Sequence, residues 1–104
     1  MAEVLKTRII VTKTPGPVGI IVETTPFKLV SYQGKWIGEE NVIYRDLIVD
    51  VLIAIRGQQR QPYAMVMIIN GVEQEINGCL EHNGVNEVRR QYPINKFVRF
   101  NSLT

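Results

Sequence analysis

The stretch DLIVDVLIAIRG, from Asp46 to Gly57, is the most apolar run of this chain and decides its fold class. A membrane-spanning helix needs about 20 predominantly apolar residues with few charges. Arg45, Asp46 and Asp50 interrupt the run, so the sequence excludes that reading. Two alternatives remain, a long strand and a buried helix.

The helix alternative covers residues 40–56. Two glutamates fall in its first turn and an Arg-Gly pair closes it, which suits the helix dipole and the C-cap. Its apolar face would hold Tyr44, Leu47, Ile48, Val51, Leu52 and Ile55. This reading predicts an α+β fold in which a sheet packs on that helix.

The strand alternative accounts for more of the side chains. Leu47, Val49, Val51, Ile53 and Ile55 alternate along one face, and five of the nine residues from 47 to 55 are β-branched. β-Branched side chains lose χ1 freedom in a helix and pack well on a pleated sheet. We therefore expect a strand, with YAMVMIING beyond the loop QQRQP (58–62) as its hairpin partner.

Turn signals divide the rest of the chain into short segments. Pro-Gly-Pro stands at 15–17, Gln-Gly-Lys at 33–35, and Asn-Gly recurs at 70–71, 77–78 and 83–84. Asn-Gly favours the two left-handed positions of a type I′ hairpin turn. FKLVSYQ and KWIG predict a hairpin about Gly34. The pattern indicates one mainly β domain over residues 1–104, a small antiparallel barrel or sandwich of seven to nine strands.

The C-terminal part predicts one short helix and a last strand. Val85, Val88 and Tyr92 recur at helical spacing and Pro93 is a stop signal, so residues 85–92 are the expected helix. The segment INKFVRF (94–100) alternates as a strand does.

Composition excludes several classes of protein. The net charge is +2 and the single cysteine permits no intrachain disulfide. This cysteine usage fits a reducing compartment or a virion interior. The first residues lack the apolar core of a signal peptide, so we expect a cytoplasmic protein with no membrane partner.

Motifs for catalysis are weak. His82 is the only histidine, the serines are Ser31 and Ser102, and no phosphate-binding glycine loop or CxxC pair occurs. We expect no enzyme and no metal or cofactor. A small nuclease or toxin that uses His82 as general acid or base is the weaker alternative.

Surplus apolar residues predict self-association. If the face opposite the buried side of the 47–55 strand stays uncovered, it makes a patch that calls for a partner subunit. The interface candidates are Ile48, Asp50, Leu52 and Ala54 on that strand, with Tyr32 and Trp36 beside the Gly34 turn. We expect a non-catalytic binding or assembly protein that contacts copies of itself or another protein, such as a viral, phage or bacterial accessory protein.

The alternative function is binding of single-stranded nucleic acid. Residues 88–104 contain four cations and no acidic residue. Interleaved cations and aromatic rings suit phosphates and stacked bases. The candidate residues are Arg89, Arg90, Lys96, Phe97, Arg99 and Phe100. The same charges would also discourage pairing at the edge of a sheet.

Overall fold

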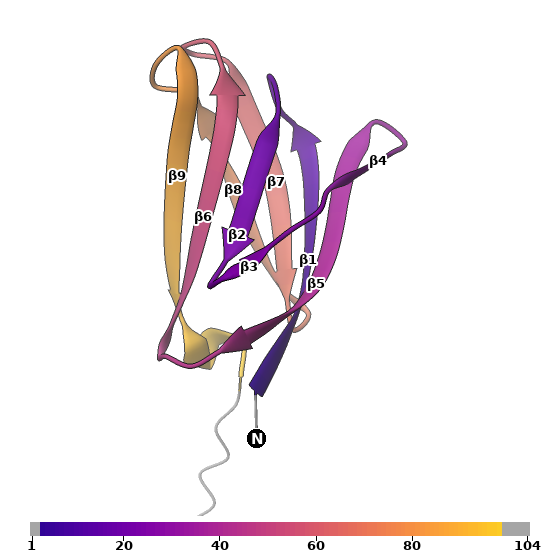
Figure 1. The fold of residues 1–104 in the computed structure, drawn as a ribbon, viewed down its shortest axis with the longest axis vertical. Helices are drawn as coiled ribbons and strands as arrows, with labels where there is room; N and C mark the ends of the chain where they lie inside the picture. The colour runs from indigo at the N-terminus through magenta and orange to yellow at the C-terminus, as the bar shows by residue number, and fades with distance from the viewer. Residues whose placement is uncertain (1–2, 99–104) are drawn as a thin grey trace, which may run out of the picture.

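Two antiparallel sheets pack face to face in the computed structural model, which describes residues 3–98 (Figure 1). The first sheet has the order β4 (Val30–Tyr32), β5 (Lys35–Tyr44), β1 (Glu3–Lys13), β7 (Pro62–Ile69) and β8 (Val72–Cys79). The second has the order β3 (Thr25–Pro26), β2 (Val18–Val22), β6 (Ile48–Gly57) and β9 (Gly84–Pro93). The predicted mainly β class is confirmed. The sheets do not close into a barrel, so the architecture is a sandwich.

The apolar stretch from Asp46 to Gly57 contains a strand, β6. Val49, Val51, Ile53 and Ile55 are each 0% exposed, whereas the residues between them are half-buried. Leu47 lies before the strand and is 75% exposed, so the buried row begins two residues later than expected. Alternation of burial with a period of two is what a strand with one core face produces.

The expected hairpin between β6 and the segment YAMVMIING, which contributes to β7, is wrong. β6 pairs with β2 on one side and with β9 on the other, while β7 pairs with β1 and β8 in the opposite sheet. Because both edges of β6 are filled, the chain must cross to the other sheet. Arg60 has the left-handed φ of 73° in this crossing, and the Gln58 amide donates to Gln61 Oε1 at 2.7 Å.

Two of the predicted hairpins are confirmed. Gln33 and Gly34 have φ values of 50° and 79°, and Asn70 and Gly71 have 49° and 82°, as a type I′ turn requires. The pair Asn77–Gly78 is not a turn and lies within β8. Gly78 is opposite Tyr63, and a Cβ at this position would lie 2.8 Å from the Tyr63 hydroxyl oxygen. This glycine therefore permits close packing and not a chain reversal.

The predicted helix over 85–92 is also wrong. These residues belong to β9, which pairs over its whole length with β6, from Ile48↔Pro93 to Gly57↔Gly84. Val88 packs against the core but Val85 is 47% exposed, so the residues at helical spacing do not share a face. Pairing with β6 along the whole segment favours a strand more than the helical spacing of these apolar residues favours a helix.

The helical element of the described residues is one 3₁₀ turn, η1 (Ile94–Lys96). The expected strand over 94–100 is therefore wrong where the structure describes it, and residues 99 and 100 lie outside the described part. Ile94 is buried and its amide donates to the Leu47 carbonyl at 2.7 Å. Phe97 is buried as well, so η1 closes this end of the sandwich.

The core lies between the sheets. It consists of the inward side chains of the long strands, joined by Phe27, Leu80, Ile94 and Phe97 from the connections. Among residues 3–98, no helix is long and apolar enough to span a membrane.

Candidate protein interface

The outer surface of the β3-β2-β6-β9 sheet, here called the β6 face, carries four of the predicted interface residues. Cross-strand register places Leu52 between Ile21 of β2 and Arg89 of β9. Ala54 lies between Gly19 and Glu87 in the next row. The β6 face consists of Gly19, Ile21, Pro26, Ile48, Asp50, Leu52, Ala54, Arg56, Val85, Glu87, Arg89, Gln91 and Pro93.

The centre of the β6 face is apolar. Ile21 is 40% exposed and Ile48 49% exposed, while Leu52 and Ala54 are half-buried. A Cβ built on Gly19 would meet nothing within 4 Å, so the described chain leaves this position uncovered. Small side chains at Gly19 and Ala54 leave room for another surface to approach the sheet closely.

Polar side chains border this apolar centre. The Arg89 guanidinium contacts both carboxylate oxygens of Asp50, with Nε–Oδ1 and Nη2–Oδ2 distances of 3.3 Å. The Gln91 amide donates to the same carboxylate at 3.3 Å. An exposed pair of this kind adds about 0–1 kcal/mol to stability, so its main effect here is to fix side-chain positions. Glu87 and Arg56 complete the charged groups of the face, which carries no net charge.

The outer surface of the other sheet, here called the β1 face, also has an apolar row. Ile10 lies opposite Ile37 of β5 and Val66 of β7, and Val30 at the β4 edge is 58% exposed. Charged side chains are more numerous on this face, and they include an Arg8–Glu39 pair at 3.3 Å. Interface cores are depleted of charged residues. The β6 face is therefore the better candidate for a contact with another subunit.

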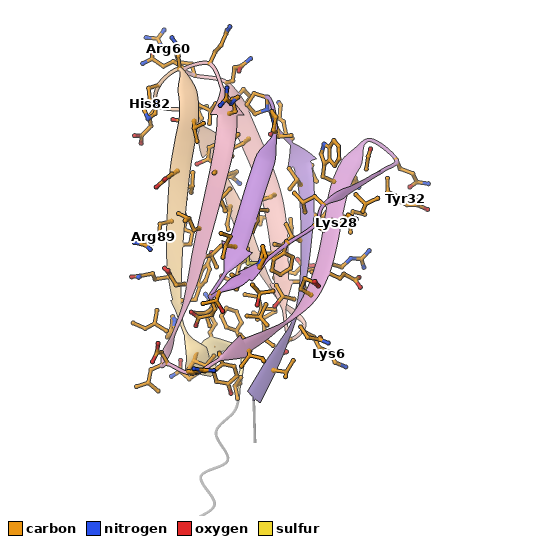
Figure 2. The ribbon with its side chains drawn as sticks, viewed as in Figure 1. Lys6, Lys28, Tyr32, Arg60, His82 and Arg89 are labelled. Atoms are coloured by element: carbon orange, nitrogen blue, oxygen red, sulfur yellow. The ribbon has the colours of Figure 1, made fainter. Side chains whose placement is uncertain are left out.

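Tyr32 and Trp36 do not join the β6 face. They lie on the β4–β5 hairpin, where Tyr32 pairs with Lys35 and Trp36 with Ser31. Figure 2 shows Tyr32 at the tip of this hairpin, away from the second sheet. Trp36 lines an open groove of about 520 Å³, here called the Trp36 groove, together with Thr14, Pro15, Gly16, Pro17, Val18 and Leu29.

The structure describes four of the residues proposed for nucleic-acid binding, Arg89, Arg90, Lys96 and Phe97. Phe97 is 7% exposed and packs edge-on against Tyr92, with ring centroids 5.8 Å apart, so its faces are not open to a base. Lys96 Nζ lies 5.6 Å from the centre of the Tyr92 ring. Arg89 is held by Asp50, as described above. Arg90 is half-buried and donates to the Arg89 carbonyl at 3.1 Å. Arg99 and Phe100 lie outside the described residues.

His82 lies in the β8–β9 connection and is exposed. It borders a hollow of about 70 Å³, and its backbone amide donates to Asn86 Oδ1 at 3.2 Å. Figure 2 shows His82 and Arg89 at different heights on the sandwich, and Arg89 is engaged by Asp50. Within residues 3–98 no group of three or more potential metal-ligating side chains comes together.

An acidic corner lies at one end of the β6 face. Burial raises the pKa of the Glu23 carboxyl above its ordinary value of 4.5, and the charges of Asp46 and Asp50 raise it further. The Glu23 amide donates to the Asp50 carbonyl at 2.8 Å, which holds the side chain in this position. Glu23 Oε1 is buried and has no hydrogen-bond partner, and φ of this residue is 57°. The proximity of these carboxyl groups therefore lowers the stability of the folded state at neutral pH.

Sequence reasoning missed the β2 and β3 side of the interface. Gly19 and Ile21 alternate with the buried Ile20 and Val22, so the sequence alone places them on one outward face. It does not say that Ile21 lies beside Leu52, because that requires the register between two strands that are far apart in the chain, Val18–Val22 and Ile48–Gly57.

Comparison with protein-family models, with curated proteins and with solved structures gives no match for this chain.

Proposed function

We propose that this protein is a non-catalytic assembly protein that binds copies of itself through the β6 face. The observation that carries the proposal is the apolar centre of that face, where Ile21, Leu52 and Ala54 adjoin Gly19. Exposed apolar patches rimmed by polar groups are typical of protein–protein contact sites. The charges of β6 and β9 on this face are balanced, two acidic and two basic, and this supports a contact with an identical copy.

Sedimentation analysis of the full chain tests this proposal. We expect a mass well above the 11.9 kDa monomer at about 100 μM protein, a concentration at which a complex with a binding free energy of about 5.5 kcal/mol or more is populated. The Leu52→Asp variant should sediment at a clearly lower mass than the unmodified chain, because it places a charge at the centre of the contact.

Ile10→Asp is the matched control. Ile10 is also half-buried and outward-facing, but on the β1 face of the opposite sheet. We expect this variant to keep the mass of the unmodified chain. A monomeric unmodified protein, or loss of assembly with Ile10→Asp alone, contradicts an interface on the β6 face.

A further inference from the structure

One stretch of β2 has an unpaired edge. β3 pairs with β2 only at Ile21 and Val22, and β6 occupies the other side of β2 from Val18 to Val22. The Phe27 amide donates to the Ile20 carbonyl at 2.9 Å, and the chain then leaves this sheet for β4. Figure 1 shows β3 running across from β2 towards the β4–β5 hairpin. The β3 side of residues 18–20 is thus left open.

The direction of the backbone groups follows from this pairing. In an antiparallel strand, the N–H and C=O of one residue point to the same side, and the next residue points to the other. Ile20 O points towards β3, because it accepts from Phe27. Pro17 O points towards β6, because it accepts from Arg56. The N–H and C=O of Val18 and the N–H of Ile20 therefore point to the open side.

The Trp36 groove lies along this open edge. Val18 is both an edge residue and part of its lining, which also includes Leu29, just before β4, and Trp36 of β5. Trp36 is 43% exposed. Free main-chain groups beside apolar pockets are the two elements by which sheets bind an added extended segment.

We propose that the open edge of β2 and the Trp36 groove bind residues 99–104 of a second copy as an added strand. Only residues 18–20 are open, so the occupant must be a short extended segment and not the edge of a folded sheet. In this chain, the segment RFNSLT follows the last described residue and offers Phe100 as the aromatic side chain for the groove. The inference rests on the proposed self-assembly and adds a head-to-tail contact to it.

The same copy is too far away to supply this segment. Phe97 lies at the opposite end of the sandwich, where its carbonyl accepts from Asn70 and the Asn70 amide donates to the Lys6 carbonyl. The groove begins at Thr14, just beyond the end of β1 at Lys13. The seven residues from Lys6 to Lys13 span about 24 Å. Phe100 follows Phe97 by three residues, which span about 11 Å at most when fully extended.

A peptide titration tests the groove directly. A synthetic peptide of residues 98–104 is added to the full chain at about 1 μM, and the emission of Trp36, the only tryptophan, is followed. We expect a saturable change. A peptide with Phe100→Asp should bind at least about tenfold more weakly, because burial of one aromatic side chain is lost. Absence of saturation at about 1 mM peptide, or equal binding of both peptides, overturns the proposal.

Two protein variants locate the binding site. Val18→Pro removes an N–H that points away from β6, so it should weaken peptide binding by about two- to tenfold while circular dichroism shows a folded sandwich. Leu52→Asp removes the proposed β6-face contact and should leave peptide affinity unchanged. Loss of peptide binding in Leu52→Asp would show that the peptide occupies the β6 face, which overturns the assignment to the groove. Sedimentation of Leu52→Asp reports on assembly through the β6 face, whereas peptide titration reports on the Trp36 groove. The two proposals can therefore fail separately.

Discussion

Replacement of Ile53 by alanine tests the strand assignment of the apolar stretch most directly. Ile53 is 0% exposed and lies at the middle of β6, between Ile20 and Val88. Truncation of a buried isoleucine to alanine removes transfer free energy and leaves a cavity, and typically costs about 2–5 kcal/mol. The neighbouring Leu52 points to the outer face and is half-buried. Leu52→Ala should cost about 1 kcal/mol or less, because only part of that side chain is withdrawn from water.

These free energies convert to melting temperatures. The unfolding entropy of a chain of 104 residues is about 0.22 kcal/mol/K near the midpoint. Ile53→Ala should therefore lower Tm by about 9–23 °C and Leu52→Ala by about 5 °C or less. Differential scanning calorimetry at a few micromolar protein, where self-association contributes least, gives both values.

The order of the two effects decides between strand and helix. In the helical alternative, Leu52 belongs to the apolar face and Ile53 points away from it. A helix would thus make Leu52→Ala the more damaging substitution. A Tm that falls more for Leu52→Ala than for Ile53→Ala would refute the alternation of buried and outward side chains along β6.

Four further substitutions test local features by urea denaturation. The folded pKa of Glu23 lies above its unfolded value of 4.5, so the folded state binds more protons between the two values and stability falls as pH rises through them. Glu23→Gln should therefore stabilise the protein at about pH 7 and change its stability little at about pH 4. Equal effects at the two pH values would contradict this. Gly71→Ala, at φ 82°, should cost about 1–2 kcal/mol, whereas Gly19→Ala in open space should be neutral or stabilising. Asn86→Ala should cost about 1–3 kcal/mol, since Asn86 is 4% exposed and accepts from two loop amides; an unchanged midpoint would mean that water replaces it.

Short-range turn chemistry made part of this fold predictable. The hairpins at Gln33–Gly34 and Asn70–Gly71 each depend on two adjacent residues that tolerate a left-handed backbone. The segments that flank them pair directly, β4 with β5 and β7 with β8. Nothing beyond about ten residues of sequence is needed to predict such a unit.

Pairing between distant segments was not predictable in the same way. The loop after β6 has the length and composition of a hairpin loop, yet it leads to the opposite sheet. The reason is that β2, well before β6 in the chain, and β9, well after it, occupy both edges of β6. Val85, Val88 and Tyr92 gave a false helical period for a related reason. Their segment forms a strand because β6 offers it a ladder ten residues long.

The candidate interface was predictable on β6 alone. Alternation placed Ile48, Leu52 and Ala54 opposite the buried row, and this is where they lie. The contribution of β2 needed the register, which only the structure supplies. Trp36 was selected as an aromatic beside a turn, whereas its actual surroundings, a groove beside an open strand edge, depend on how the β4–β5 hairpin diverges from β2.

The apolar surplus on β6 and that on β2 argue together for a contact surface. A strand with one core face needs apolar residues only at alternate positions, and β8 follows this rule by placing Glu73 and Glu75 outward. β6 and β2 depart from it with Leu52 and Ile21, which the described core does not use. The two departures arise in segments far apart in sequence, yet the register makes these side chains direct neighbours. Outward apolar side chains scattered at random would be single exposed residues, which need no explanation. Outward apolar side chains that lie together in one row form the kind of patch that a partner surface contacts.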